Sequence, residues 1–405
     1  MMNGIQYGIN NGLSAPFQPG FAGGPCSGPI TFGNGIPQTG GSGPCSLPLR
    51  STCDPSFVGA CGIQPLGSPF GARRAVTTWK VNYLISNRTN QAAHTDPDLI
   101  NPWGIALFDN QIWVVNGGTD TLTNYDLFGN KLLGSISVRN TDHNSSYPTG
   151  LAINCNGNFS TTNGSLTKAG LFLTCSEHTT VHSYNPQVNP LVSYLVLNQQ
   201  LTGEVGVYRG LAIVGDVLYL ADFFQGHIDV FDSNYNRLLG LPFVDGDTSE
   251  PIPLSYGPTN IVNIGCFLYV LWARKDPSVP LQAIDGAGFG YISVFQLDGT
   301  FVRRFTSRGV LNNPWAMIPA PEECGFPPGS FLVSNHGDGR INVFDCAGKY
   351  VGPLLNQSGL PMVIEGVRGL APHYTDFNEI YFTASYEENI DGLTGSIIRD
   401  QIIYL

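Results

Sequence analysis

The chain has 405 residues, and its 19 Lys and Arg against 30 Asp and Glu give a formal net charge of −11. Only 12% of the residues are charged, while 50 are Gly and 29 are Pro, a composition that excludes a helical bundle and favours a turn-rich architecture. Because an acidic chain without a stripe of Lys and Arg repels phosphate backbones, nucleic acid is also excluded as a partner class.

Residues 1–75 differ in composition from the rest of the chain and are predicted to form a Gly/Pro/Cys-rich tail or anchor. The segment has no periodic apolar face whose burial would offset the entropy of ordering its backbone. It also lacks the basic and apolar regions of a signal peptide, and no apolar run in the chain reaches the roughly 18 residues that a membrane span needs. We therefore expect an irregular segment and no membrane span.

Four cysteines lie in this tail, at spacings that match no zinc-binding pattern: Cys26, Cys45, Cys53 and Cys61. Two interpretations remain open. In an oxidising compartment the four thiols would cross-link within the tail or between chains, whereas in a reducing one they would stay as inert thiols. A flexible segment of this length reaches roughly 50 Å, which is far enough to contact neighbouring molecules.

Residues 76–405 repeat one pattern of four short apolar runs separated by Gly, Asn, Asp and Pro. Runs of this length and composition predict β-strands. The first run of each unit is marked by a residue at a spacing of 46, 60, 50, 56 and 53, namely Gly104, Gly150, Gly210, Asn260, Ala316 and Gly369. A period near fifty with four strands per unit is typical of a propeller blade, so the sequence predicts an all-β fold, a six-bladed β-propeller.

The sixth unit reaches the end of the chain after three strands, and a lone strand-like segment, Trp79 to Ser86, precedes the first unit. We expect this N-terminal strand to become the outermost strand of the last blade. Such pairing would remove an open sheet edge and close the ring.

Several stretches of the chain resemble an uncharacterised family of six-bladed propellers that is related to NHL-repeat proteins. They include Thr95–Leu107, Tyr208–Tyr235, Gly286–Phe305 and Asn313–Asp345. The family is seen in predicted exported bacterial proteins, some of which carry a PEP-CTERM sorting tail. The resemblance implies the propeller fold, but it does not extend to the Gly/Pro/Cys tail and implies no activity.

Polar residues follow the second strand in four of the predicted blades, where we expect them to converge on the channel mouth: Asn116, Glu177, Asp222 and Asn335. Carboxylate and amide oxygens suit Ca²⁺, and the architecture resembles lactonase-like propellers that hold a divalent metal in this region. The alternative is that these side chains cap tight turns. His336, which lies beside Asp338, is a separate candidate: it is either a general base or a surface residue without a catalytic role.

The remaining candidates concern covalent modification. Cys324 and Cys346 are expected on the same face of one blade, where a disulfide would add about 3 kcal/mol of stability. Cys155, Cys175 and Cys266 are expected to be small buried apolar residues. Five N-x-S/T sequons are candidate glycosylation sites or chance matches in an Asn-rich chain, at Asn87, Asn144, Asn158, Asn163 and Asn356.

Three functions are compatible with these features. The first is a structural or interaction protein without enzymatic activity, in which the tail joins a rigid propeller to protein partners or to other copies of itself. That arrangement resembles the outer-layer proteins of large DNA virus particles and would place the chain at a virion surface or in another extracellular assembly. The second is a Ca²⁺-dependent lactonase or esterase at the channel mouth, and the third is a sugar- or peptide-binding module.

Overall fold

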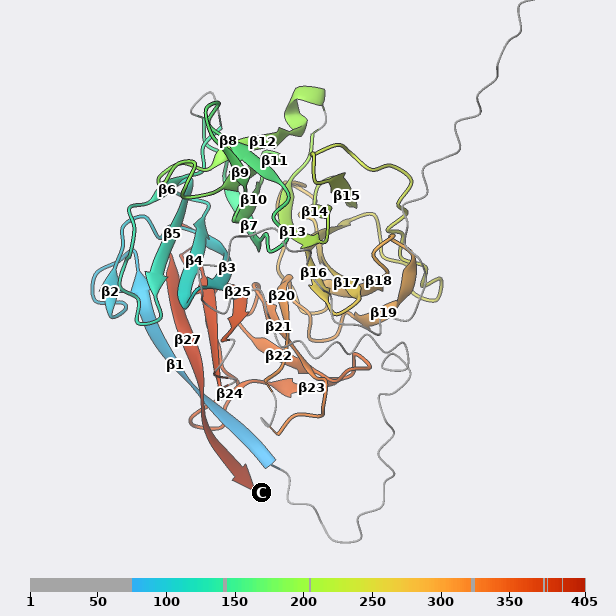
Figure 1. The fold of residues 1–405 in the computed structure, drawn as a ribbon. Helices are drawn as coiled ribbons and strands as arrows, with labels where there is room; N and C mark the ends of the chain where they lie inside the picture. Colours follow the sequence, from blue (N-terminus) through green and yellow to red (C-terminus); the bar gives the residue numbers. More distant parts are fainter. Residues whose placement is uncertain are drawn as a thin grey trace, which may run out of the picture.

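The computed structural model describes residues 75–404, apart from 141–143, 204, 322–324, 374, 375, 377 and 388. The described chain is almost entirely β-structure, and its strands form six sheets arranged around a central channel. Figure 1 shows the innermost strands of the six sheets, β3, β7, β13, β16, β20 and β25, gathered around the centre. Each of these strands contacts the next, and β25 contacts β3, so the ring is closed. The predicted six-bladed propeller is confirmed.

The blades follow one another in chain order, and each is an antiparallel sheet. Blade 1 contains β3 (Pro102–Phe108), β4 (Gln111–Asn116), β5 (Thr121–Asp126) and β6 (Ile136–Ser137). Blade 2 contains β7 (Pro148–Ile153), β10 (Phe172–Ser176), β11 (Thr180–Tyr184) and β12 (Tyr194–Asn198). Blade 3 contains β13 (Tyr208–Val214), β14 (Val217–Asp222) and β15 (His227–Asp232).

Blade 4 contains β16 (Tyr256–Ile264), β17 (Phe267–Arg274), β18 (Gly290–Phe295) and β19 (Phe301–Ser307). Blade 5 contains β20 (Pro314–Pro319), β21 (Phe331–Asn335), β22 (Ile341–Phe344) and β23 (Tyr350–Pro353). Blade 6 contains β25 (Val367–Pro372), β26 (Glu379–Ala384), β27 (Leu393–Tyr404) and β1 (Ala75–Ser86), with the short strands β2 (His94–Thr95) and β24 (Leu355–Asn356) paired to β1.

This connectivity defines two faces of the ring. The second strand of each blade passes to the third at one end of the channel, which we call the upper face, and each blade passes to the next at that same end. The first strand passes to the second at the opposite end, the lower face.

The cores lie between neighbouring blades, where the alternate side chains of each sheet meet those of the next. At the interface of blades 1 and 2, for example, the Trp113 ring lies 4.6 Å from the Phe172 ring and 6.1 Å from the Tyr184 ring. The innermost strands approach so closely that a Cβ on Gly104 would lie 2.7 Å from the backbone nitrogen of Leu151. The repeated glycine of the first strand therefore permits the tight ring.

The N-terminal strand closes the ring as the sequence predicts. β1 is antiparallel to β27 along its full length, from Ala75 opposite Tyr404 to Ser86 opposite Leu393. Figure 1 shows the two strands side by side at the edge of blade 6. The Trp79 side chain is fully buried in the core of blades 5 and 6 and stacks on Phe326 at 6.5 Å.

Two local features depart from the expected four strands per blade. In blade 3 the fourth strand is reduced to a single bridge between Phe231 and Arg237, because Gly240 has a positive φ of 82° and Pro242 has no amide hydrogen for a ladder. In blade 2 an additional hairpin, β8 (Ser160–Thr162) and β9 (Thr167–Ala169), lies between the first and second main strands. The short 3₁₀ helix η1 (Gln199–Thr202) follows β12, and no helix in the described part of the chain could cross a bilayer.

Candidate functional site

The two asparagines predicted at the channel mouth are buried and bonded within the fold. Asn116 ends β4 and donates its side-chain amide to the hydroxyls of Thr121 and Thr123, at 3.1 and 3.0 Å. Asn335 ends β21 and donates to the carbonyl of Val310 at 2.6 Å. Both side chains are fully buried, and each amide oxygen lacks a hydrogen-bond partner. The two residues thus hold strand ends and connections together at the upper face.

The two predicted carboxylates are also engaged. Asp222 ends β14 and accepts hydrogen bonds from the backbone nitrogens of Val207 and Gln225, at 3.1 and 3.0 Å, so it caps the turn into β15. Glu177 is half-buried, and one of its oxygens lies 3.4 Å from the guanidinium of Arg209. Turn capping, one of the two interpretations of these positions, therefore describes Asp222.

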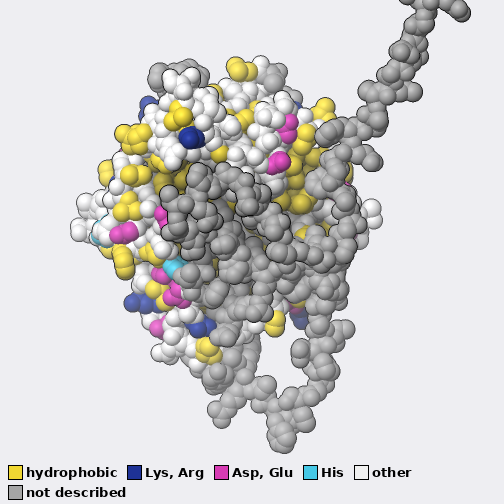
Figure 2. All heavy atoms as spheres, in the orientation of Figure 1, with side chains coloured by type: hydrophobic (Ala, Val, Ile, Leu, Met, Phe, Trp, Pro, Cys, Tyr) yellow, Lys and Arg dark blue, Asp and Glu magenta, His cyan; other side chains and the backbone are white. Residues whose placement is uncertain are grey.

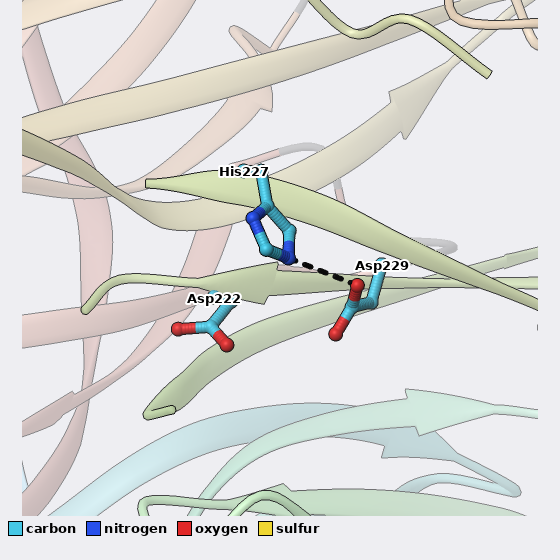
Figure 3. Close-up of side chains that lie close together, drawn as sticks. All are labelled: Asp222, His227 and Asp229. Atoms are coloured by element: carbon cyan, nitrogen blue, oxygen red, sulfur yellow. Dashed lines mark hydrogen bonds and ion pairs between the residues drawn. The ribbon is translucent and has the colours of Figure 1, made fainter. Parts of the chain in front are cut away.

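One cluster in the described residues has the composition of a metal site, and it contains Asp222 but none of the other three predicted ligands. Asp222, His227 and Asp229 each offer a ligand atom within 4.8 Å of the others. Figure 3 shows Asp222 at the end of β14 beside His227 and Asp229 on β15, with His227 Nε2 3.0 Å from an Asp229 oxygen. The Tyr208 hydroxyl donates to the second Asp229 oxygen at 2.7 Å, and Arg237 pairs with the first.

The charges in this cluster are already compensated. Burial raises the pKa of Asp222. Burial would also raise the pKa of Asp229, but hydrogen bonds from His227 and Tyr208, together with the positive charges of His227 and Arg237, lower it. The hydrogen bond to Asp229 raises the pKa of His227. A divalent cation would have to displace the Arg237 guanidinium, so this donor set fits an internal ion-pair network better than a metal centre.

The throat of the channel is lined by the guanidinium groups of two arginines and the indole rings of two tryptophans, none of which was among the predicted site residues. Arg209 and Arg368 are the second residues of β13 and β25, and Trp103 is the second residue of β3. The guanidinium carbon of Arg368 lies 3.8 Å from the centroid of the Trp103 ring, and that of Arg209 lies 5.6 Å from it. Trp315, the second residue of β20, meets Trp103 edge to face at 6.1 Å.

Hydrogen bonds hold the two arginines in place. Arg368 donates to Asn101 Oδ1 at 2.5 Å, to Asn389 Oδ1 at 2.7 Å and to the Ser385 hydroxyl. Arg209 donates to the carbonyl of Leu281 at 2.8 Å, and its Nε is buried without a hydrogen-bond partner. Both side chains are more than nine-tenths buried.

Two positive charges in one buried throat affect the neighbouring titrations. Burial and the charge of Arg209 lower the pKa of Arg368 to about 9. Burial, followed by the charges of Arg368 and Arg209, lowers the pKa of His336 to about 3. His336 is therefore a neutral, weak base, and a throat with this charge repels Ca²⁺ rather than attracting it.

The sequence did carry a signal for the throat. The residue immediately before the marked position of the first strand is Trp103, Thr149, Arg209, Thr259, Trp315 or Arg368 in the six repeats. Once the repeats are aligned, this position is equivalent in all blades and lies at the upper end of the channel. Two cations at an equivalent inward position form a pattern that can be recognised without coordinates.

Below the tryptophans the channel widens into a cavity of about 780 Å³, which we call the lower cavity. Each innermost strand contributes an apolar side chain to its wall: Leu107, Ile153, Ile213, Val262, Met317 and Leu370. The cavity extends to the connections of the lower face, where Cys155, Asn156 and Asp216 line it. Its volume lies in the range of about 300–1,000 Å³ that is typical of binding pockets.

The cysteines of the propeller occupy different environments. Cys175 in β10 is a buried free thiol, as expected, and burial raises its pKa to about 11. The expectation of burial is wrong for Cys155 and Cys266, which are half-buried in the first-to-second connections of blades 2 and 4. Cys324 and the four tail cysteines, Cys26, Cys45, Cys53 and Cys61, lie outside the described residues, so the bond between Cys324 and Cys346 stays a prediction.

The five sequons differ in accessibility. Asn144 and Asn163 are exposed, whereas Asn87, Asn158 and Asn356 are half-buried. The side-chain nitrogen of Asn87, to which a glycan would be attached, donates to Asp391 at 2.9 Å across the seam of blade 6. Glycosylation of any of the five stays a prediction; Asn144 and Asn163 are the exposed sequons, although the side-chain nitrogen of Asn163 donates to the carbonyl of Val188 at 3.0 Å.

Comparison with known proteins shows two relatives that match nearly their whole length. The uncharacterised protein R648 of Acanthamoeba polyphaga mimivirus is 75% identical over 410 residues, covering 100% of both chains. The uncharacterised protein L690 of the same virus is 69% identical over 369 residues, covering 91% of this chain and 99% of L690. The chain belongs to this family of mimivirus proteins. No family model matches it.

Among solved structures, a Bacteroides thetaiotaomicron protein of unknown function superposes with a TM-score of 0.50 at 12% identity, covering 80% of this chain and 76% of that one. A streptogramin B lyase gives a TM-score of 0.48 at 10% identity, covering 82% and 100%. These likenesses concern the fold alone. None of these relatives and structures supports the expected resemblance of the chain to bacterial exported proteins with a PEP-CTERM sorting tail.

Proposed function

We propose that the protein is a structural or interaction module without enzymatic activity, in which the propeller holds a peptide segment at its lower face. The observation that carries this proposal is the lower cavity, to whose wall each of the six blades contributes an apolar side chain, beside the polar residues Asn156, Asp216, Asn260 and Asn263. A wall of aliphatic side chains suits an apolar peptide segment better than a sugar or a polar substrate, because it offers few partners for hydroxyl groups.

The polar residues at the upper face of the channel also support this proposal, because they lack the properties of a catalytic or Ca²⁺ site. Asp222 caps a turn, Glu177 faces Arg209, and His336 has a pKa far below neutrality. A general base needs a pKa near the working pH, and a Ca²⁺ site needs oxygen ligands that are not already neutralised by guanidinium groups. We therefore propose that these polar groups stabilise turns and strand ends rather than bind a substrate or a metal.

The assembly that we propose is the outer layer of a virus particle, with the N-terminal segment as the tether. Support comes from the family, whose members named above are mimivirus proteins, and from the tail cysteines, which would cross-link neighbouring chains in an oxidising environment. Figure 2 shows hydrophobic side chains spread between a few charged ones on the face in view, in keeping with a sparsely charged chain.

Non-reducing electrophoresis of the full-length protein from purified particles tests the tether. We expect multimers that collapse to monomers on reduction, and we expect Cys26→Ser/Cys45→Ser to abolish them. Ser27→Ala/Ser46→Ala, which changes the neighbouring residues, is the matched control and should leave the multimers intact. Failure to find the protein in particles, or a monomer under non-reducing conditions, would refute the proposal.

The second candidate function is a Ca²⁺-dependent hydrolase, which the cluster of Asp222, His227 and Asp229 favours. Metal analysis of the purified protein and melting with Ca²⁺ or a chelator distinguish the two functions. A melting shift that disappears in Asp229→Asn, together with lactone turnover, would establish the hydrolase. We expect neither, because Arg237 already neutralises Asp229.

A further inference from the structure

Two positive charges enter the throat from opposite sides of the ring. Arg209 lies on β13 of blade 3 and Arg368 on β25 of blade 6, and in the order of the six innermost strands these two face each other across the channel. Both guanidinium groups lie against the Trp103 ring, at 3.8 Å for Arg368 and 5.6 Å for Arg209. The two charges are therefore close neighbours in a part of the fold that excludes water.

The charge of Arg368 has no counterion within the described residues. Its hydrogen bonds to Asn101, Ser385 and Asn389 all end on uncharged oxygens, and it takes part in no ion pair there. Asp285, whose charge acts on Arg368 from a distance, is an exposed residue. Buried charges in proteins are ordinarily paired with an opposite charge, because an unpaired charge is costly to remove from water. The hydrogen bonds of Arg368 replace the lost water but leave its charge uncompensated.

Arg209 is compensated only in part. Its Nη2 lies 3.4 Å from a Glu177 oxygen and donates to the carbonyl of Leu281 at 2.8 Å, while its Nε is buried without a hydrogen-bond partner. A guanidinium has five N–H donors, so both arginines keep donors that the fold does not use. His336 is neutral, and one carboxylate therefore faces two guanidinium groups. The throat carries one positive charge in excess.

We propose that the throat binds one small organic carboxylate, which accepts hydrogen bonds from Arg209 and Arg368 together and supplies the missing negative charge. A monoanion balances a single excess charge, whereas a dianion such as sulfate would reverse its sign. The planar carboxylate also matches the planar donor groups of the two arginines.

The aromatic surroundings favour an organic acid over an inorganic ion. Trp103 contacts both guanidinium groups, Trp315 meets Trp103 edge to face at 6.1 Å, and the Phe223 ring lies 4.1 Å from the guanidinium carbon of Arg209. These rings offer apolar surface to the substituent of a carboxylic acid. A strongly hydrated inorganic ion gains nothing from such contacts.

The site opens at the upper face. The Glu177 side chain is 34% exposed, and Leu281 is an exposed residue of the long connection between β17 and β18. A bridge between Lys275 and Ala283 folds this connection into a hairpin, which extends from blade 4 to Arg209 of blade 3. A small anion therefore approaches the arginines past one half-exposed side chain and one surface hairpin, and the blades stay packed.

This site goes beyond the proposed function and is independent of it. It lies at the upper face and involves neither the lower cavity nor the N-terminal tail, so it stands or falls apart from the tether. Asp222 and His336 are not among its ligands. Glu177 competes with the bound carboxylate for Arg209, which gives the site a variant with enhanced affinity as well as one with reduced affinity.

Binding of carbon-13-labelled acetate to the full-length protein tests the proposal. The relaxation rate of the acetate carboxyl carbon is measured against protein concentration, at an ionic strength held constant with sodium chloride. We expect saturable binding with a Kd on the order of 1 mM, which is within reach of a ligand of this size. We also expect propionate to displace the acetate and sulfate to displace it much less. Absence of saturable binding, or equal displacement by sulfate, would overturn the proposal.

A substitution in the throat distinguishes this site from general attraction of anions to the protein. Arg368→Gln is expected to raise the Kd for acetate by about tenfold or more, because a hydrogen bond between charged groups is lost. Arg340→Gln removes the same charge at an exposed position and is the matched control, with an unchanged Kd. Equal Kd values in the two variants would show that the anion binds elsewhere.

Glu177→Gln provides a test that does not depend on the folding of Arg368→Gln. It removes the competing carboxylate from a half-exposed position, so the Kd for acetate is expected to fall by about threefold or more. Asp109→Asn removes a carboxylate from the exposed turn between β3 and β4 at the lower face and should leave the Kd unchanged. An unchanged or higher Kd in Glu177→Gln would contradict the proposal, since Glu177 would then hold the arginines for structural reasons alone.

Discussion

Burial of the two throat arginines, Arg209 and Arg368, is costly unless a few neighbouring residues compensate each positive charge. A guanidinium that is moved out of water loses hydration, which hydrogen bonds and aromatic contacts must replace. Arg368 meets this demand through Asn101, Ser385 and Asn389 and through the face of Trp103. The arrangement depends on a planar group with several donors in fixed directions, which lysine does not provide.

We therefore predict that Arg368→Lys lowers the free energy of unfolding by about 1–3 kcal/mol. The single ammonium group of lysine cannot reach both Asn101 and Asn389, so one of the two loses its hydrogen-bond donor. Urea unfolding followed by tryptophan fluorescence measures the change. Arg340→Lys, at an exposed position beside blade 5, is the matched control and should change the free energy by less than about 0.5 kcal/mol. Equal stability of Arg368→Lys and wild type would show that the fork geometry is dispensable.

The pair of His227 and Asp229 predicts a pH dependence with a defined sign. The folded-state pKa of His227 is raised by its hydrogen bond to Asp229, so the stabilisation is complete below the unfolded pKa of about 6.5 and is lost as the pH rises through the folded-state pKa. We expect His227→Gln to melt about 1–2 °C below wild type at pH 5.5, with the gap closing on the alkaline side. The effect is small because the imidazole is half-exposed.

Differential scanning fluorimetry from pH 5.5 to 9 measures this gap, and His94→Gln in β2 is the control. A gap that widens with rising pH would contradict the assignment, since it would mean that the neutral imidazole is the stabilising form. The chosen range stays above the pH at which Asp229, whose pKa is lowered, would itself take up a proton.

At the scale of the element, the strands that repeat were predictable and the irregular ones were not. The period of the first strands and the lone segment Trp79–Ser86 predicted six blades and their closure, because repeated glycines and apolar runs report directly on the packing of one blade against the next. The fourth strand of blade 3 failed because Gly240 and Pro242 outweigh the apolar residues around them. The β8–β9 hairpin lies in an insertion, outside the repeat that made the prediction.

The same distinction holds for the candidate site. Strand ends carry Asn and Asp both when they cap turns and when they bind metals, so the residue type alone could not separate these roles for Asp222 and Asn335. What separates them is the identity of the groups that face each oxygen: the backbone amides of Val207 and Gln225 at Asp222, and the guanidinium of Arg209 at Glu177. The lower cavity was beyond prediction because its volume depends on how six strands fit together.

The closing strand carries one of the largest fully buried side chains of the described residues. Trp79 is fully buried against the core of blades 5 and 6, so we predict that Trp79→Ala lowers the free energy of unfolding by about 3–5 kcal/mol through lost burial and the cavity left behind. Lys80→Ala, the next residue of β1, is exposed and should cost less than about 0.5 kcal/mol. Similar chemical denaturation midpoints for both variants would indicate that β1 contributes little to closure.

At the scale of the whole molecule, the ring couples elements that are far apart in the sequence. Every innermost strand contacts two others, and the seam of blade 6 joins β1 to β27 across about 300 residues of chain. A ring of this kind has no end blade from which unfolding can start, so loss of the seam affects neighbouring blades as well as blade 6. Pairing of β1 with β27 is therefore expected to affect the stability of the whole ring and not of blade 6 alone.

Two truncations separate the seam from the tail. Removing residues 1–86 deletes β1, exposes the edge of β27 and removes Trp79, so we predict a melting temperature at least about 10 °C lower or an insoluble product. Removing residues 1–74 keeps β1 and its pairing with β27, so we predict a smaller decrease. Both proteins are compared with the full chain by calorimetry at the same concentration. Should the shorter truncation melt as low as the longer one, the ring would owe its closure to the tail; should the longer one melt like the full chain, β1 would not be the closing strand in solution.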